Sequence, residues 1–288
     1  MSTRDLSAPI GIYDSGVGGL SILAALKALL PAEQFYYVAD SYHCPYGDRS
    51  ATEIQRLALG VAHHMVDAGC KLIVVACNTI SATSLPILRR RLPDIPIVGM
   101  VPAVKPAIEI TRTGVIGVLA TQATVRGALY LEVLQQYGGD TKVISQPCPG
   151  LVELIEAGKL DCEETVALIS HCLTPIIKAG ADVIVLGCSH YPFVRPLIER
   201  LAGPLVRIIE PSDAIALQTR RVLEREGLLT DAAPHSAGRT LFATSGAASV
   251  FDESVLRLTG IKSDAESLIW VSGSLRALSA LPVASRCS

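Results

Sequence analysis

Two cysteines lie in matching surroundings at distant points of the chain. Residues 68–79 read AGCKLIVVACNT and residues 179–190 read AGADVIVLGCSH, and the two segments align without a gap, with Cys77 opposite Cys188. Both cysteines follow an apolar run of strand length and precede polar residues. A lone cysteine is more often a small buried hydrophobe, but two at matched positions indicate a shared function. Because the pKa of a free thiol is about 8.5, either sulfur could give or take a proton near neutral pH.

Two further titratable residues lie close to such runs. Asp14 ends an apolar run and opens the loop Ser15-Gly16-Val17-Gly18-Gly19, which matches neither GxGxxG nor a Walker loop. A carboxylate at this point would repel a phosphate, so we expect the loop to bring backbone close to a small ligand beside Asp14; the alternative is a purely structural turn. His190, two residues after Cys188, could stabilise a thiolate or relay its proton, although a lone histidine is often structural.

The loops that could surround a ligand contain no lysine or arginine at residues 14–19, 45–47, 77–79, 121–124 and 188–191. The carboxylates of an anionic substrate must then be held by backbone N–H groups and neutral polar side chains. These side chains are Ser15, Asn78, Thr79, Thr121, Thr124 and Ser189. The turn Pro45-Tyr46-Gly47 could add backbone amides, although Pro and Gly mark turns everywhere. No Rossmann fingerprint, Walker loop or HExxH motif occurs, so no cofactor is implied by motif.

Regular elements must carry these residues to one place. Apolar runs predict strands at 10–13, 35–39, 71–76, 115–119, 182–186 and 240–243, and helical spacing predicts helices at 18–30, 51–68, 163–179 and 212–226. Short apolar strands alternating with helices predict a parallel sheet covered on both faces. Ligands bind beyond the carboxyl ends of such strands, where Cys77 and Cys188 fall. The start of the helix after each cysteine is expected to lower the pKa of its thiol.

A second pair of similar segments follows in the same order. IGIYDS begins at Ile10 and IGVLAT begins at Ile116, so the first strand of each half has a counterpart. Two matched pairs at a similar offset favour a diverged internal repeat. Two similar halves that face one another would place Cys77 and Cys188 across a shared cleft. That arrangement is the central structural expectation.

Composition limits the class of protein. The chain has 288 residues and a net charge of −2, from 25 Lys and Arg against 27 Asp and Glu. No stretch of the chain carries a marked excess of Lys and Arg, and Arg89-Arg90-Arg91 is expected at a solvated helix end. Nucleic-acid binding is therefore not predicted. The first nine residues lack the apolar core of a signal peptide, and no apolar run reaches the roughly 18 residues of a membrane span. These features predict a soluble, cytoplasmic protein.

The eight cysteines lie at positions 44, 70, 77, 148, 162, 172, 188 and 287 and include no CxxC pair. In a cytosolic chain this pattern argues against a disulfide framework and against a structural zinc site. We expect most of these cysteines to be small buried hydrophobes.

Together the motifs resemble the glutamate racemases of the aspartate/glutamate racemase superfamily. The resemblance runs from Gly11 to about Gly260 and includes, in this order, GIYDSGVGGLS, ADSYHCPYG, VVACNT, CPGLVELIEAG and GCSHYP. It implies a cytoplasmic isomerase (EC 5.1.1.3) that interconverts L- and D-glutamate without pyridoxal phosphate or metal. It also implies a role in supplying D-glutamate for peptidoglycan, and thus in cell wall biogenesis and cell shape, and it leaves a homodimer open.

The same resemblance implies a fold and its division. The fold would be α/β, with two pseudo-symmetric Rossmann-like or flavodoxin-like domains, mainly parallel sheets, and the active site in the interdomain cleft. The first domain would comprise residues 1–98 and 212–288, and the second residues 99–211. Met100-Val101-Pro102 replaces the commoner acidic hinge residue of the family, and the tail beyond Trp270 has no clear counterpart.

Position by position, the resemblance implies two bases. Cys77 looks like the base that acts on D-glutamate, with Asp14 beside it. Cys188 looks like the base that acts on L-glutamate, assisted by His190, and Glu156 resembles the acidic residue that supports this side. Asp40 matches a family acid near the site whose role is less certain. Ser189 stands where the family usually has threonine. The positions that match substrate contacts of the family are Ser15, Pro45, Tyr46, Gly47, Asn78, Thr79, Thr121, Thr124 and Ser189.

Three rival functions stay open on the sequence. The same thiol pair could racemise another amino acid, above all aspartate. A cysteine hydrolase would use Cys188, His190 and an acid, and it would leave Cys77 idle. A two-domain binding protein would hold a small amino acid and exchange no α-proton.

Overall fold

Two separate sheets form the frame of the molecule in a computed structural model, which describes residues 5–232 and 238–280. The strands of the larger sheet are β1 (Ile10–Asp14), β2 (Phe35–Ala39), β3 (Leu72–Val75), β4 (Ile97–Gly99), β9 (Thr240–Thr244), β10 (Glu266–Val271) and β11 (Ser274–Ala277). Their order is β11-β10-β9-β2-β1-β3-β4. Neighbouring strands run parallel except for the terminal pair β10 and β11, which is antiparallel.

The smaller sheet is entirely parallel and repeats part of the larger one. Its strands are β5 (Val115–Ala120), β6 (Lys142–Pro147), β7 (Val183–Gly187) and β8 (Arg207–Ile209). Their order, β6-β5-β7-β8, repeats the order β2-β1-β3-β4, so β5 takes the place of β1 and β7 takes the place of β3. The segments that matched in sequence therefore contain β1 with β5 and β3 with β7, which are the two middle strands of this shared four-strand order. The predicted α/β class, with two similar and mainly parallel sheets, is confirmed.

Helices cover both faces of the larger sheet. Successive side chains of a strand point to opposite faces, so Ile12 and Val74 pack into one hydrophobic cluster and Tyr13 and Val75 into another. The first cluster contains side chains of α1 (Leu20–Leu29), α10 (Ser212–Glu226) and α11 (Ala248–Thr259), and the second those of α2 (Ala51–Asp67) and α3 (Asn78–Arg91).

The smaller sheet is covered in the same way. Ile184 and Leu186 pack on one face and Val183 and Val185 on the other. The first face meets α7 (Leu151–Glu156), α8 (Glu163–Lys178) and α9 (Arg195–Ala202), and the second meets α4 (Val104–Ile110), α5 (Gln122–Arg126) and α6 (Ala128–Tyr137). Three short 3-10 helices are η1 (Ser41–His43), η2 (Tyr191–Val194) and η3 (Leu278–Ala280).

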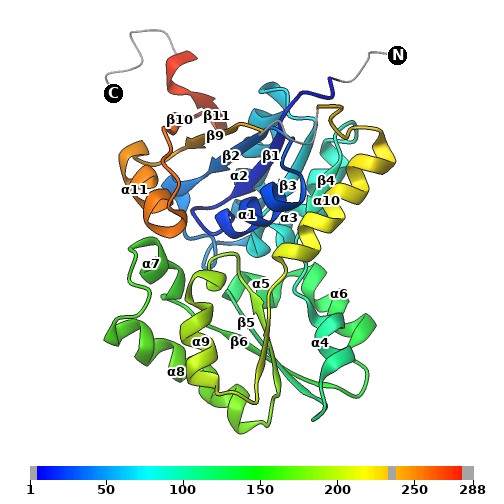
Figure 1. The fold of residues 1–288 in the computed structure, drawn as a ribbon, viewed down its shortest axis with the longest axis vertical. Coiled ribbons are helices and arrows are strands. Elements are labelled where there is room, and N and C mark those ends of the chain that lie inside the picture. Colours follow the sequence, from blue (N-terminus) through cyan, green and yellow to red (C-terminus); the bar gives the residue numbers. More distant parts are fainter. Residues whose placement is uncertain (1–4, 233–237, 281–288) are drawn as a thin grey trace.

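The chain crosses between the two sheets twice. It leaves the larger sheet after β4 and returns after β8, so that α10 packs beside α1. In Figure 1 the larger sheet and its helices lie above the green elements of the smaller one, and yellow α10 runs back alongside the upper sheet. Among the described residues, no helix combines the length and apolarity needed to cross a membrane.

The elements predicted from periodicity are present. Each of the predicted strands and helices lies within two residues of its expected ends. Arg89, Arg90 and Arg91 form the exposed end of α3, as expected. Strands β4, β6, β8, β10 and β11 were not anticipated: β4 and β8 have only three residues each, and β6 is only partly buried, so none of these three presents a long apolar run.

The expectation for the cysteines is wrong at one pair. Cys148, just after β6, and Cys172, in α8, form a disulfide with their Cα atoms 5.9 Å apart. Their separation of 24 residues carried no signal, because the pair is created by the packing of α8 against β6. Cys70, Cys77 and Cys188 are free and buried, whereas Cys44 and Cys162 are free and partly exposed. Cys287 lies outside the described residues.

Candidate active site

The two matched cysteines lie beyond the carboxyl ends of equivalent strands. Cys77 follows β3 and is the N-cap residue of α3, and Cys188 directly follows β7. Each is only 4% exposed. Cys188 is near enough to act electrostatically on the Cys77 thiol, as is His190. The site therefore forms where the two sheets meet.

Asp14 joins the two halves of the site. Its Oδ1 atom accepts a hydrogen bond of 2.8 Å from the backbone N–H of Gly16, and its Oδ2 atom accepts one of 2.8 Å from Ser189 Oγ. Burial raises the pKa of Asp14, although the charge of His190 and these two hydrogen bonds oppose the rise. Because Asp14 ends β1 and Ser189 follows β7, this link holds the two sheets together at the candidate site.

The glycine-rich loop is glycine-rich because side chains of the other half press against it. A Cβ atom on Gly16 would lie 1.9 Å from Glu156 Oε1, and one on Gly18 would lie 2.4 Å from His190 Nδ1. The backbone N–H of Val17 donates to Glu156 Oε1 over 2.9 Å. The loop backbone thus lies close to two candidate catalytic side chains, Glu156 and His190, and its expected approach to a ligand stays a prediction.

The buried side chain of His190 pairs with the partly exposed carboxylate of Glu156 beside Cys188. His190 Nε2 lies 2.6 Å from Glu156 Oε1, and His190 Nδ1 lies 4.0 Å from Cys188 Sγ. Burial lowers the pKa of His190, but hydrogen bonds with Cys188, Cys44 and Glu156 outweigh it and leave that pKa well above its ordinary value. Burial raises the pKa of Glu156, but the contact with His190 outweighs it and lowers that pKa. The raised pKa favours the protonated ring of His190 beside Cys188.

At Cys77, the expected lowering of the thiol pKa by a helix start is wrong. Burial raises the pKa of Cys77 to about 12, and the charge of Asp14 adds to the rise, whereas the backbone N–H of Ile80 opposes it without overcoming it. The reason is that a sulfur cut off from water loses more hydration than one helix terminus returns. Cys188 precedes the 3-10 helix η2 rather than an α-helix. The two thiols thus lie in different electrostatic surroundings.

A cluster of hydroxyl groups forms another wall of the site. Thr79 Oγ1 lies 2.8 Å from Thr121 Oγ1 and 3.4 Å from Thr124 Oγ1, and the latter two are 2.9 Å apart. Thr79 lies in the first turn of α3, whereas Thr121 caps α5 by accepting the N–H of Thr124. The three predicted residues are therefore brought together from both halves.

Asn78 is buried without a partner. It follows Cys77, it is 1% exposed, and neither its side-chain oxygen nor its nitrogen has a hydrogen-bond partner among the described residues. A buried amide left unpaired costs about 1–3 kcal/mol. Such a group is best explained by a ligand that supplies the missing hydrogen bonds.

Comparison with known proteins gives these residues a family. The model of the family described as Asp/Glu/Hydantoin racemase matches residues 19–219. The chain belongs to this family. A glutamate racemase of Herpetosiphon aurantiacus is 50% identical over 238 residues, which cover 83% of this chain and 92% of that protein.

Solved structures agree with this placement in the racemase family. A glutamate racemase isoform of Bacillus anthracis superposes with a TM-score of 0.85 at 31% identity, over 94% of this chain and all of that one. A glutamate racemase of Francisella tularensis, solved in complex with D-glutamate, gives a TM-score of 0.81 at 27% identity, over 93% and 99% of the two chains.

In this racemase, Asp40 fixes a turn. Its carboxylate accepts hydrogen bonds from His43, Tyr46, Ser245 and Trp270, at 3.0, 2.5, 2.5 and 2.8 Å. Burial raises the pKa of Asp40, but these hydrogen bonds, led by that of His43, outweigh it and lower that pKa. Asp40 thereby ties the end of β2 to the strands β9 and β10.

The turn after it contributes backbone to the site. The hydroxyl of Tyr46 lies between Asp40 and the hydroxyl of Tyr13, so its side chain is fully engaged. The carbonyl of Gly47 accepts the N–H of Ala123, and a Cβ atom on Gly47 would lie 3.1 Å from Thr121. Pro45 lines a cavity of about 380 Å³ that also reaches Glu156.

Sequence reasoning missed Cys44 and Tyr37. Cys44 Sγ donates to Glu156 Oε1 over 3.7 Å, and the hydroxyl of Tyr37 donates to the carbonyl of Gly16 over 2.8 Å. The only available signal was position, since Cys44 precedes the Pro45 turn and Tyr37 lies in β2.

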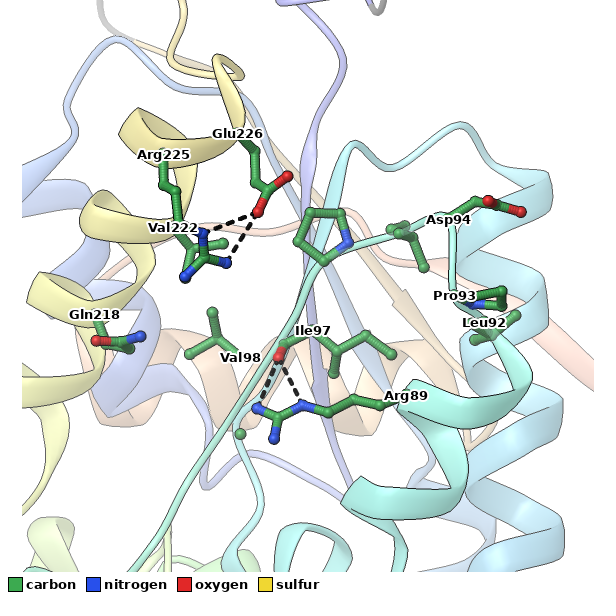
Figure 2. Close-up of a pocket in the computed structure, with 13 residues that line it drawn as sticks. Arg89, Leu92, Pro93, Asp94, Ile97, Val98, Gln218, Val222, Arg225 and Glu226 are labelled. Atoms are coloured by element: carbon green, nitrogen blue, oxygen red, sulfur yellow. Dashed lines mark hydrogen bonds and ion pairs between the residues drawn. The ribbon is translucent and has the colours of Figure 1, made fainter.

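A second cavity lies apart from the predicted residues of the racemase. It has a volume of about 360 Å³ and lies between the end of α3, β4 and α10 (Figure 2). Arg89 fills part of its floor, where its guanidinium donates to the carbonyl of Ile97. Because none of the candidate catalytic or substrate-contacting side chains lines it, we do not assign the reaction to this cavity.

Proposed function

We propose that this chain interconverts L- and D-glutamate without a cofactor, by a two-base reaction between Cys77 and Cys188 that supplies D-glutamate for peptidoglycan. The observation that carries the proposal is the equivalent placement of two buried thiols after β3 and β7, linked by Asp14 and Ser189. The relatives named above, which are glutamate racemases, support glutamate as the substrate.

The proposed reaction removes the proton from one face of the α-carbon and adds a proton to the opposite face. With L-glutamate, the Cys188 thiolate takes the α-proton, the C–H bond breaks and an S–H bond forms. The electron pair remains on the substrate as an enediolate-like species, and the Cys77 thiol returns a proton from the opposite face. With D-glutamate the two cysteines exchange these roles. The raised pKa of Cys77 and the imidazolium of His190 beside Cys188 support this starting distribution of protons.

Positioning falls to His190, Glu156 and Asp14. Glu156 holds the imidazolium of His190 against Cys188, and Asp14 lies beside Cys77, on whose thiol its charge acts. The α-proton of an amino acid is very weakly acidic, so the developing negative charge needs preorganised donors in a site that excludes water. The proposed donors are backbone N–H groups at the starts of α3 and α5 and the side-chain amide of Asn78, and the lack of a partner for that amide supports its role.

We propose that neutral donors bind the two carboxylates of the substrate. The unpartnered amide of Asn78 and the hydroxyl cluster described above support this proposal. The proposed set contains Ser15, Pro45, Tyr46, Gly47, Asn78, Thr79, Thr121, Thr124 and Ser189. Tyr46 and Pro45 would contribute backbone and shape, because the Tyr46 hydroxyl is already engaged with Asp40.

We also propose two domains, residues 1–98 with 212–288 and residues 99–211, that close on the substrate. The support is that strands within residues 10–99 and 240–277 build one sheet, whereas strands within residues 115–209 build the other. We further propose a cytoplasmic enzyme that works as a homodimer; light scattering of the purified protein would test the dimer by its mass.

Exchange of the α-proton tests the reaction. Incubation of L-glutamate, and separately of D-glutamate, with the full chain in D₂O is expected to place deuterium on the α-carbon of the inverted product. Cys77→Ser and Cys188→Ser should each abolish inversion, because each removes the acid or base of one face. Circular dichroism measures inversion and proton NMR measures exchange.

The rivals give different results in the same experiment. An aspartate racemase would invert aspartate faster than glutamate, and a cysteine hydrolase would keep its activity in Cys77→Ser. A binding protein would exchange no α-proton with either substrate. Inversion of glutamate that survives the loss of either sulfur would contradict the two-base proposal.

A further inference from the structure

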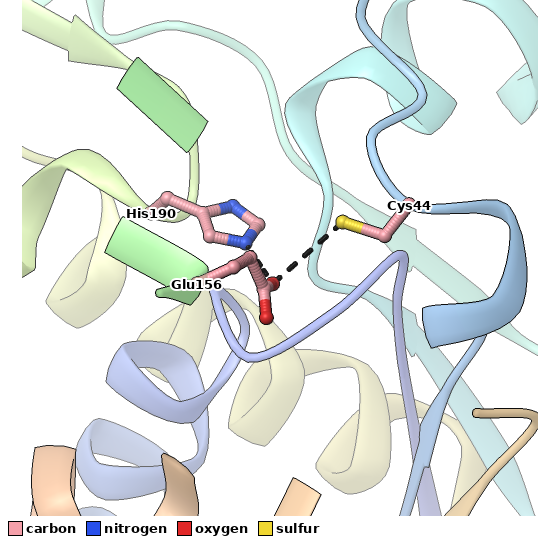
Figure 3. A group of neighbouring side chains, drawn as sticks. All are labelled: Cys44, Glu156 and His190. Atoms are coloured by element: carbon pink, nitrogen blue, oxygen red, sulfur yellow. Dashed lines mark hydrogen bonds and ion pairs between the residues drawn. The ribbon is translucent and has the colours of Figure 1, made fainter. Parts of the chain in front are cut away.

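Three side chains that no motif connects converge at the edge of the candidate site. Cys44 follows η1, Glu156 ends α7 and His190 precedes η2, yet the Sγ atom of Cys44, a carboxylate oxygen of Glu156 and a ring nitrogen of His190 all lie within 4.8 Å of one another (Figure 3). Cys44 Sγ is 3.7 Å from Glu156 Oε1, which is 2.6 Å from His190 Nε2. Figure 3 shows the three side chains pointing toward one another from three separate segments.

The donor set suits a zinc ion. Thiolate, imidazole and carboxylate are all zinc ligands, and zinc binds them at about 2.0–2.3 Å in tetrahedral geometry. Such bond lengths separate neighbouring ligand atoms by about 3.3–3.8 Å. The distance between Cys44 and Glu156 already fits, and that between Glu156 and His190 must open by less than about 1 Å. Three protein ligands would leave the fourth position to water.

The cluster can be reached from solvent. The cavity of about 380 Å³ described above is lined by Cys44, Pro45 and Glu156 on one side and by α11 residues, including Val250, on the other. The side chain of Glu156 remains 25% exposed. Within the described part of the chain, its carboxylate is ion-paired with His190 and with no Lys or Arg. A cation entering here therefore competes with His190 for this carboxylate, and with no ion-paired Lys or Arg side chain.

We propose that Cys44, Glu156 and His190 form a binding site for Zn²⁺, and that its occupation inhibits the enzyme. Binding releases one proton from the Cys44 thiol and one from the His190 imidazolium to solvent, and the ion takes their places. Burial raises the pKa of Cys44 to about 12, but a coordinating thiol is deprotonated by the charge of the ion itself. The inhibitory half of this inference rests on the proposed racemase function.

The ion would inhibit the enzyme because it would disrupt the contacts of His190 and Glu156 beside Cys188. His190 presently offers one ring nitrogen to Glu156 and the other to Cys188, and Glu156 also accepts the N–H of Val17. An ion held by His190 and Glu156 would replace the imidazolium beside Cys188 and loosen the glycine-rich loop. The ion is therefore an inhibitor and not a cofactor. Because the ligands come from three separate segments, the lack of a CxxC motif did not exclude this site.

Cobalt(II) tests the site without reference to activity. The full chain, freed of metal with a chelator, is titrated with Co²⁺, which gives a thiolate-to-cobalt charge-transfer band in the near ultraviolet when a cysteine binds it. We expect one Co²⁺ per chain, displaced by one Zn²⁺. Cys44→Ala should lose the band, whereas Cys162→Ala, which removes another partly exposed free cysteine at the start of α8, should keep it.

Inhibition is measured separately. Zn²⁺ is expected to slow glutamate inversion by the wild-type chain and by Cys162→Ala, with recovery on adding a chelator. Relative to its own metal-free rate, Cys44→Ala should need at least about tenfold more Zn²⁺ for half inhibition, since one of three protein ligands is gone. The melting temperature of each variant checks its folding. If Cys44→Ala does not fold, Glu156→Gln takes its place and should likewise lose the cobalt band.

The outcomes separate the two proposals. A cobalt band that persists in Cys44→Ala would assign the metal to Cys77 or Cys188 and overturn this site, as would the absence of any band. A Cys44-dependent band in a protein that does not invert glutamate would support the metal site and reject the racemase proposal. Inhibition by Zn²⁺ that is equal in wild type and Cys44→Ala would overturn the inhibitory role.

Discussion

Single residues around the two thiols differ in how their polar groups are satisfied. The side chains of Asp14, Glu156 and His190 each have hydrogen-bond partners, whereas the side chain of Asn78 has none among the described residues. A protein keeps an unpaired buried amide at a cost in stability, so such a group is best explained by a ligand. We therefore expect substitution of Asn78 to affect substrate binding more than stability, and substitution of a residue with native hydrogen-bond partners to affect stability more.

Replacing Asn78 with alanine tests whether its amide binds substrate rather than stabilising the fold. Asn78→Ala is expected to lower kcat/KM for glutamate by about ten- to hundredfold, because the substrate loses a buried hydrogen-bond partner. The free energy of unfolding without substrate should not fall, since no native hydrogen bond is broken and an unpaired buried amide is removed. Circular dichroism measures the first quantity and urea unfolding the second.

Ser81→Ala is the matched control for Asn78→Ala. Ser81 lies in the same helix and is equally buried, but its hydroxyl accepts the N–H of Met100 over 2.9 Å and donates to the carbonyl of Val75. Its loss should reduce stability by about 1–3 kcal/mol and leave the affinity for substrate unchanged. If Asn78→Ala instead behaves like Ser81→Ala, the amide has a structural role and the ligand argument is wrong.

Whole elements place these residues by close contacts between the two halves. The loop between β1 and α1 carries Gly16 and Gly18 against Glu156, at the end of α7, and His190, in the loop after β7. The turn after β2 is held by Asp40, whose partners Ser245 and Trp270 belong to the C-terminal part of the larger sheet. At this scale the packing of elements decides which side chains meet.

Adding one methyl group to the loop should disturb the ion pair. A Cβ atom on Gly16 would lie 1.9 Å from Glu156 Oε1, so Gly16→Ala must push Glu156 away from His190. We expect activity to fall by at least about tenfold and stability by about 1–3 kcal/mol. Gly69→Ala is the control. Alanine at the φ of +79° of Gly69 would strain the backbone and so reduce stability, but nothing lies within 4 Å of the added Cβ atom. Activity lost equally in both variants would point to general destabilisation.

Asp40 should make the fold sensitive to acid. Hydrogen bonds lower the folded pKa of Asp40, so its contribution to stability is present above the unfolded pKa of about 3.9 and is lost as pH falls through the folded pKa. Asp40→Asn should cost about 1–3 kcal/mol at pH 7. The gap between wild type and Asp40→Asn should narrow below about pH 4. Urea unfolding across pH measures it, and a gap that stays constant would show that the charge of Asp40 is irrelevant.

The whole molecule is two sheets linked by two chain crossings, with the candidate site where they meet. Asp14, Cys77 and Asn78 lie at the ends of strands of the larger sheet, and Cys188 and Ser189 lie at the end of a strand of the smaller sheet. A ligand held between them contacts both halves. Binding should therefore stabilise the assembly and draw the halves together.

Scattering and unfolding test this closure. Saturation with D-glutamate is expected to reduce the radius of gyration measured by small-angle X-ray scattering. At a hundred times the dissociation constant, the ligand should also raise the free energy of unfolding by about 2.7 kcal/mol. L-Lysine, whose side chain carries the opposite charge, is the control and should do neither. A stabilising effect of D-glutamate with an unchanged radius of gyration would reject closure.

Much of the frame could be predicted because its signal is local. Periods of apolar residues gave the strands around Asp14 and Cys77 and the helix ending at Glu226 to within two residues. The matched cysteines followed from two similar segments, and the equivalent places of β3 and β7 agree with that reading. Short edge strands such as β4 and β8 could not be predicted, since three residues show no period.

What the sequence determined by itself was the order of elements and the chemical types at their ends, because both depend on neighbours along the chain. Only the tertiary structure decided that Asp14 binds Ser189, that Cys44 meets Glu156 and His190, and that Cys148 bonds Cys172. It also decided that the Cys77 thiol has a raised pKa. The physical reason is the same in each case: contacts and burial depend on everything that surrounds a group in space, and most of those neighbours lie far away in sequence.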